Sequence, residues 1–292
     1  MAALEREVDR VPGPRKAGVL LALFHLARRE QEGDAAEQYA RAARQNAPED
    51  AVILRTLARV LRDKAPLEAA ALWLEEAEVA QGPRSAFAAT FAGRLLESAQ
   101  AEAGRAYRRA LQSEATYPAA VWSLELFLRQ GNDLDALNAL DIQQAEALGA
   151  SVLGHARRLR AALHLAPRDP HAAARLLGGV EGYASDLNVA FEAALRIGER
   201  LSPPARAELL LQFAERPALG ILTRHARLRA ALALEEARDF SRAAACYAEL
   251  LATDAADVAA ALGSERSEIL AGMTARVTEQ RLRLAQEARS PR

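Results

Sequence analysis

Small and apolar residues recur along this chain at helical spacing, and the helical segments themselves recur about every 34 residues. Steps of this length from Ala17 reach Ala51, Ser85, Ala119, Leu153 and Leu187, and each opens such a segment. Turn-forming residues lie near the middle of most units, at Gly33-Asp34, Pro66, Gly131-Asn132-Asp133, Asp169-Pro170 and Ser202-Pro203. A fixed period of this length indicates stacked helix–turn–helix units.

The pattern divides the chain into a leading or capping helix at 1–14, a tandem repeat domain at 15–256 and C-terminal capping helices at 257–289. The predicted repeat units are 17–48, 51–83, 85–117, 119–152, 153–186, 187–219 and 223–256. The loop at Glu215–Gly220 shifts the period by about three residues before the last unit. The leading helix is compatible with a capping helix and with the second half of a preceding unit.

The second unit has the clearest amphipathic pattern. Its first helix carries Leu54, Leu57, Ala58 and Leu61 on one stripe, and its second helix carries Ala70, Trp73, Leu74 and Ala77. The same reasoning predicts that Trp122 packs in the core. It also predicts that Cys246, between apolar neighbours, is a small packing residue.

Composition supports helices throughout. Hydrophobic residues make up 51% of the 292 residues and aromatic residues only 5%, while Ala, Leu and Arg dominate. These residues lead the helix propensity scale, and no run of alternating β-branched residues predicts a strand.

The repeat resembles the tetratricopeptide repeat (TPR) family in a divergent form of about seven units. The second unit supplies Leu54, Leu57, Ala58, Leu61, Ala70, Leu74, Ala77 and Pro83; the first supplies Leu20, Leu23, Gly33-Asp34, Tyr39 and Pro48. The last unit supplies Asp239-Phe240, Ala243, Tyr247 and Leu251, whereas the fourth to sixth units depart further. The resemblance implies an all-α, right-handed superhelical solenoid of stacked antiparallel helix pairs. Armadillo-like and HEAT-like stacks have longer periods and fit less well.

The resemblance also implies that the first helices of successive units line a concave groove. Its positional grid gives these candidate partner-binding residues: Arg28, Arg55, Arg59, Arg62, Phe127, Gln130, Arg157, His164, Asn188 and Phe191. None of the grid positions in the first six units is Asp or Glu. Phe127 and Phe191 are the expected apolar contacts.

Arg55, Arg59 and Arg62 are spaced to lie on one helical face. One interpretation is that Glu75, Glu76 or another helix pairs with them, or that they form a solvated face. The other is a groove that binds an acidic or C-terminal peptide segment, because guanidinium groups bind carboxylates through paired hydrogen bonds. The Lys and Asn pattern of a chaperone-type carboxylate clamp is missing.

The sequence gives no support for catalysis, a cofactor or a metal. The five histidines show no i, i+4 pair and no HExxH motif, and a single cysteine excludes a multi-cysteine site. Gly178–Gly182 lacks the preceding strand and following Lys-Ser/Thr of a P-loop, so a turn between helices is expected. We therefore expect a chain that is not an enzyme and binds no cofactor.

The net charge and the hydropathy of the chain bear on its partners and on its cellular location. A net charge of -1 argues against a nucleic-acid partner bound through a strong positive field. No apolar run is long enough to span a membrane, and Val19–Leu26 lacks the features of a signal peptide, so we expect a cytoplasmic protein. The oligomeric state stays open.

Two functions follow from the repeat. The first is a protein–protein interaction scaffold or adaptor that binds a peptide segment of a partner, with an acidic segment favoured, in the concave groove. The alternative is a sensory or regulatory repeat module of a larger bacterial regulator or assembly, suggested by the leading helix. A subunit role in a larger enzyme has no positive support in the sequence.

Overall fold

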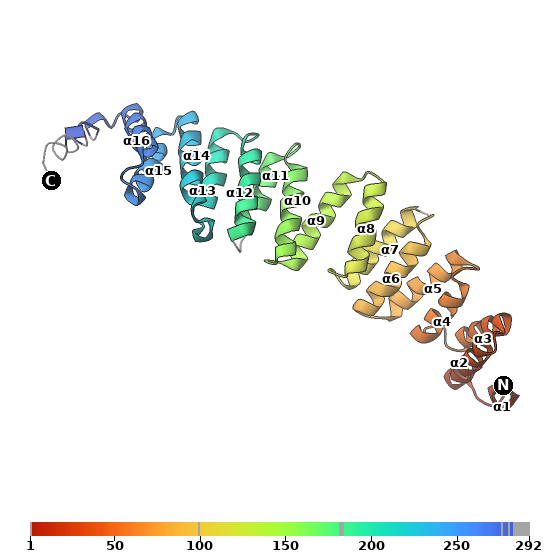
Figure 1. Cartoon of the computed structure of the whole chain (residues 1–292). Helices are drawn as coiled ribbons and strands as arrows, with labels where there is room; N and C mark the ends of the chain where they lie inside the picture. The colour runs from red at the N-terminus through yellow and green to blue at the C-terminus, as the bar shows by residue number, and fades with distance from the viewer. Residues whose placement is uncertain (1, 99, 181–183, 276, 280, 283–292) are drawn as a thin grey trace. The chain divides into compact units, whose positions relative to one another are not determined.

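The computed structural model describes residues 2–98, 100–180, 184–275, 277–279 and 281–282, and all regular elements within these ranges are helices (Figure 1). In chain order they are α1 (Ala2–Val8), α2 (Gly13–Arg29), α3 (Gly33–Asn46), α4 (Ala51–Leu61), α5 (Pro66–Val79), α6 (Pro83–Leu95), α7 (Gln100–Ser113), α8 (Pro118–Gln130), α9 (Leu134–Leu148), α10 (Val152–Leu165), α11 (Pro170–Gly178), α12 (Ala184–Gly198), α13 (Pro203–Ala214), the 3₁₀ turn η1 (Pro217–Leu219), α14 (Leu222–Glu236), α15 (Phe240–Thr253) and α16 (Val258–Leu270).

The chain divides into two compact parts, Met1–Leu137 and Asn138–Arg292. In the N-terminal part, α2 packs on α3, α4 on α5 and α6 on α7, and each pair contacts the next through α3–α4, α5–α6 and α7–α8. In the C-terminal part, the same pairing joins α10 to α11, α12 to α13 and α14 to α15, with α16 on α15. The predicted all-α class of stacked helix pairs is confirmed. The TPR assignment and the number of repeats stay predictions.

Prolines and acidic caps mark where the helices begin. Pro66, Pro83 and Pro118 each stand at the first position of a helix, where a missing N–H costs no intrahelical bond. Asp50 caps α4 by accepting hydrogen bonds from the backbone N–H groups of Val52 (2.8 Å) and Ile53 (3.2 Å). These proline and aspartate positions therefore mark where the helices of the repeat begin.

The turns inside three of the helix pairs share one backbone conformation. Gln31, Asn132 and Arg238 all have positive φ, of 64°, 52° and 61°. At each turn the N–H of the following residue donates to a carbonyl near the end of the preceding helix, at 2.9 Å in α2, 3.0 Å in α8 and 2.9 Å in α14. Asn tolerates this left-handed conformation, whereas Gln and Arg adopt it at a cost.

Close approach between paired helices depends on glycine at two places. A Cβ on Gly93 in α6 would lie 2.4 Å from Cε1 of Tyr107 in α7. Tyr107 is fully buried, and its hydroxyl donates to Glu97 at 2.8 Å. In the C-terminal part, a Cβ on Gly263 would lie 2.3 Å from Cζ of Tyr247. Each glycine leaves room for the tyrosine ring of the neighbouring helix.

Ion pairs connect helices of consecutive pairs. Arg41 in α3 donates two hydrogen bonds, of 2.6 and 3.0 Å, to Glu68 in α5, and Arg44 donates to Glu75 at 2.8 Å. The C-terminal part has analogous contacts, Arg242–Glu208 at 2.6 Å and Arg266–Glu235 at 2.6 Å. The partners in these contacts are 27 to 34 residues apart in sequence, so they join neighbouring repeats.

Two of the three single-residue packing predictions are confirmed. Trp73 is 1% exposed and Cys246 is buried. The prediction for Trp122 is wrong, because Trp122 is 67% exposed. It lies with Leu126 on the side of α8 opposite the buried Val121 and Leu124, so the apolar stripe of this helix faces another direction than the repeat pattern indicated.

Some sequence predictions extend beyond the residues that the structure describes. The expected capping region at 257–289 contains α16, but residues 276, 280 and 283–289 are outside the described ranges. The glycine-rich turn at 178–182 follows the end of α11, and its residues 181–182 are likewise outside them.

Candidate functional site

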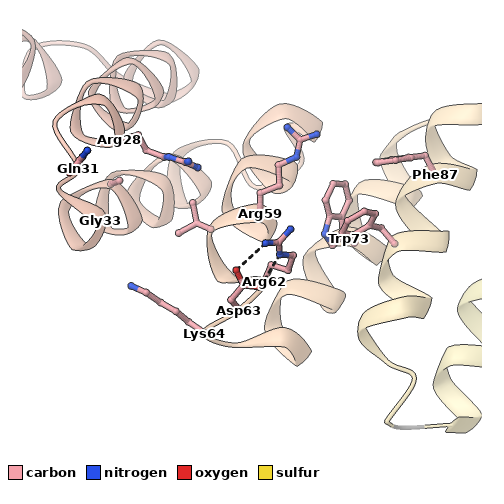
Figure 2. Close-up of a pocket in the computed structure, with 12 residues that line it drawn as sticks. Arg28, Gln31, Gly33, Arg59, Arg62, Asp63, Lys64, Trp73 and Phe87 are labelled. Atoms are coloured by element: carbon pink, nitrogen blue, oxygen red, sulfur yellow. Dashed lines mark hydrogen bonds and ion pairs between the residues drawn. The ribbon is translucent and has the colours of Figure 1, made fainter.

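The N-terminal part contains a pocket of about 640 Å³ between α2, α3, α4, α5 and α6 (Figure 2). Its volume is within the usual range for sites that bind small molecules. It is lined by Arg28, Gln31, Gly33, Ala36, Arg59, Val60, Arg62, Asp63, Lys64, Trp73, Phe87 and Phe91.

Two of the four cations in the lining have no carboxylate partner among the described residues. Arg28 and Arg59 are exposed, and neither forms an ion pair within that portion of the chain. Arg28 extends from α2 and Arg59 from α4, and Figure 2 shows both side chains at the pocket. These two guanidinium groups are available to an external anion.

The other two cations are engaged locally. Arg62 donates two hydrogen bonds, of 2.9 and 3.1 Å, to the adjacent Asp63, and this contact lowers the pKa of the Asp63 carboxyl. Lys64 contacts Asp34 at 3.3 Å and Glu37 at 3.2 Å. These groups are solvated, so their contacts are weak and can be exchanged for a ligand at little cost.

Aromatic residues form another side of the pocket. Trp73 from α5 packs against Phe87 and Phe91 from α6, with ring centroids 5.7 and 5.1 Å apart. Phe87 and Phe91 are themselves 5.7 Å apart, and Phe87 is 37% exposed. The buried Nε1 of Trp73 has no hydrogen-bond partner within the described structure. The pocket thus combines free cations with an accessible ring.

Three of the ten predicted site residues, Arg28, Arg59 and Arg62, line this pocket. Arg55, on the same helix, does not. It donates a 2.8 Å hydrogen bond from Nε to Oε1 of Glu76, whose side chain is completely buried, and a second from Nη2 to the same oxygen. For Arg55, the interpretation that Glu76 pairs with it is therefore confirmed, and its contact with a partner stays a prediction.

The predicted apolar contacts are not free surface rings. Phe191 is fully buried, with ring centroids 5.8 Å from Phe213 and 5.9 Å from His225. Its prediction as a groove contact is wrong, because the face of α12 that carries it packs into the core of the C-terminal part. Phe127 is half-buried and packs edge-on against Tyr107 at 6.3 Å.

The remaining predicted residues do not join the pocket lining. Gln130 lies exposed at the end of α8. Arg157 donates to the buried Asp141 at 2.8 Å, and Arg160 binds the same carboxylate. His164 and Asn188 are exposed on α10 and α12. Partner binding at these four positions stays a prediction.

Sequence reasoning missed the aromatic side of the pocket. Phe87 and Phe91 are one helical turn apart, so they lie on one face of α6, but the family grid uses other positions of that helix. An aromatic i, i+4 pair in a chain with only 5% aromatic residues is the signal that could have identified them. Trp73 was correctly assigned to the core, and it also lines the pocket.

Among the described residues, no cluster of three or more His, Cys, Asp or Glu side chains is arranged to hold a metal ion. None of the helices in these ranges has the length and hydropathy to cross a membrane.

Comparisons with known proteins add little. No family model and no curated protein matches the chain. One similar solved chain belongs to a structure of Naa15/Naa10 bound to HypK-THB, with 17% identity over 86% of this chain and 39% of that chain, at a TM-score of 0.39. Another is the assembly chaperone of RpL4 (Acl4), residues 1–338, with 13% identity over 90% of this chain and 99% of that chain, at a TM-score of 0.27. This chain spans only 39% of the first of these, and both likenesses are too weak to assign a function.

Proposed function

We propose that this chain is a protein–protein interaction scaffold without enzymatic activity, and that the pocket between α2 and α6 binds an acidic peptide segment of a partner. The observation that carries the proposal is the pair Arg28 and Arg59. Both line the pocket and are exposed, with no carboxylate partner in the described part of the chain.

Charge explains why an acidic segment is favoured. A guanidinium group presents parallel N–H donors that match a carboxylate, and this arrangement gives both affinity and orientation. An anion that contacts Arg28 or Arg59 gains charge-assisted hydrogen bonds that neither guanidinium group forms with a carboxylate in the described part of the chain. The pocket is open to solvent, so the attraction is screened by salt and binding weakens as ionic strength rises.

The proposal is tested with a fluorescein-labelled peptide that contains two glutamates and one phenylalanine in a Gly/Ser background. Fluorescence anisotropy measures its affinity for the full chain and for the double variant Arg28→Gln/Arg59→Gln. Exposed charge pairs contribute up to about 1 kcal/mol each, so we expect the double variant to bind about tenfold more weakly.

A matched control separates pocket binding from bulk electrostatics. Arg15 and Arg84 are exposed on α2 and α6, and they do not line the pocket. The double variant Arg15→Gln/Arg84→Gln removes the same charge and should keep the affinity within about twofold. Equal losses in the two double variants, or no binding of the peptide to the unsubstituted chain, would contradict the proposal.

A further inference from the structure

The cationic and the aromatic side chains of the pocket lie on different sides of it. Its free cations come from α2 and α4, whereas its exposed ring comes from α6. Figure 2 shows Arg28 and Phe87 on opposite sides of the space, with Arg59 between them. A ligand that fills this space therefore contacts cations with one portion and aromatic carbon with another.

We infer that the pocket recognises two side chains of one segment at once: an acidic side chain at Arg28 and Arg59, and an aromatic side chain at Phe87 and Phe91. This inference rests on the proposed function and adds which side chains the partner presents and where each one binds. The recognised feature is the pair of side chains and their spacing, and acidity alone is insufficient.

The volume of the pocket and the exposed ring of Phe87 favour a ligand that makes two side-chain contacts over one that makes a single contact. A single carboxylate fills a small fraction of about 640 Å³ and leaves the accessible face of Phe87 in water. An aromatic side chain of the partner would remove that face from water and pack edge-on or offset against the rings, the arrangements aromatic pairs prefer.

Trp73 holds the aromatic side of the pocket in place. It lines the pocket together with Arg59 and Arg62 and packs on Phe87, with ring centroids 5.7 Å apart. Its own side chain is only 1% exposed and its Nε1 is buried, so Phe87 offers the accessible aromatic surface to a ligand.

Double-mutant cycles test the assignment of each contact. Four peptides are compared: the glutamate–phenylalanine peptide, its Glu→Gln form, its Phe→Ala form, and the form with both changes. Their affinities are measured for the unsubstituted chain, Arg59→Gln and Phe87→Ala. We expect Arg59→Gln to weaken binding about threefold for peptides with glutamate, and to have no effect on the others.

The aromatic contact should show the complementary pattern. Phe87→Ala should weaken binding about fivefold for peptides that retain phenylalanine, with no effect on the Phe→Ala forms. Arg59→Gln in the protein and Phe→Ala in the peptide should have nearly additive effects on the binding free energy. The same should hold for Phe87→Ala in the protein and Glu→Gln in the peptide. Varying the number of Gly/Ser residues between the two features should give one optimum spacing.

The outcomes distinguish this inference from the proposed function. If no peptide binds, the proposed function itself fails. If binding depends on Arg59 but shows no coupling between Phe87 and the peptide phenylalanine, acidic recognition stands and the two-side-chain inference is overturned. Phe87→Leu, which keeps an apolar side chain, is the control for misfolding. Its circular dichroism spectrum should match that of the unsubstituted chain, and it should bind with intermediate affinity.

Discussion

The contact between Gly93 and Tyr107 allows a sharp test of the packing between α6 and α7. The perturbation is Gly93→Ala, which adds one methyl group inside a helix. On helix propensity alone, this change stabilises by about 1 kcal/mol, because alanine is the best helix former and glycine one of the worst. The position of the added carbon reverses that expectation.

Three atoms of the Tyr107 ring lie 2.4, 2.7 and 3.0 Å from the Cβ that alanine would carry. Such distances are far inside van der Waals contact, so the ring or a helix must move. Tyr107 is fully buried and its hydroxyl is held by Glu97 at 2.8 Å, which leaves little freedom to adjust. Overpacking of this kind costs about 1–3 kcal/mol, and more when a hydrogen bond of about 1 kcal/mol is lost with it. The net expectation is a loss of up to about 2 kcal/mol, or about 1–3 kcal/mol when the hydrogen bond is lost as well.

Urea unfolding followed by far-ultraviolet circular dichroism measures this loss. Gly18→Ala is the matched control, because Gly18 is an exposed residue inside α2 and an added Cβ would meet no atom within 4 Å. The control should stabilise by about 0.5–1 kcal/mol. In a Tyr107→Leu background, Gly93→Ala should cost less than it does alone. A gain in stability from Gly93→Ala equal to that from Gly18→Ala would refute the steric reasoning.

Four further predictions use the same unfolding measurement. Arg55→Ala leaves the fully buried carboxylate of Glu76 without its partner and should destabilise by about 3–5 kcal/mol, whereas Arg84→Ala on the surface should change stability by no more than about 0.5 kcal/mol. Arg238→Gly relieves a left-handed residue and should stabilise by about 1 kcal/mol, while Asn132→Gly, at a residue that tolerates this conformation, should gain less. Burial raises the pKa of Tyr247 from 10.0 to about 12, so the unfolded chain loses that proton first and the free energy of unfolding should fall as pH rises across this interval; in Tyr247→Phe the fall should be smaller. Raising the salt concentration should lower stability less in Arg41→Gln/Arg44→Gln than in the unsubstituted chain, and an identical salt response would show that these pairs contribute nothing.

Much of the fold could be predicted from the sequence because the signals are local. Helix periodicity and proline or aspartate at helix starts depend on residues within one or two turns of each other. Asp50, Pro66 and Pro83 all mark observed helix boundaries. A period then repeats those local signals, so each additional unit strengthens the same prediction.

The candidate site could be predicted only in part, because it depends on helix rotation and on partners distant in sequence. The positional grid of the repeat family assumes that residues at the same position of each unit face the same direction in space. Arg55 and Arg59 are one turn apart on α4, yet Arg55 contacts Glu76 on α5 and Arg59 faces the pocket. Phe191 was misplaced for a related reason, since the rotation of α12 directs it into the core. Such details follow from packing between helices, which one repeat pattern does not encode.

The ion pairs between consecutive repeats impose an order on the helix pairs. Arg41 and Arg44 on α3 contact Glu68 and Glu75 on α5. The residues about 34 positions further on, in α7, are Glu102 and Arg109. If the repeat formed by α4 and α5 were excised, α3 would therefore present Arg44 to an arginine where it now meets a glutamate. The repeats share a backbone plan, but their surfaces are matched to particular neighbours. Loss of the unit formed by α4 and α5 would thus create a charge mismatch at the new junction.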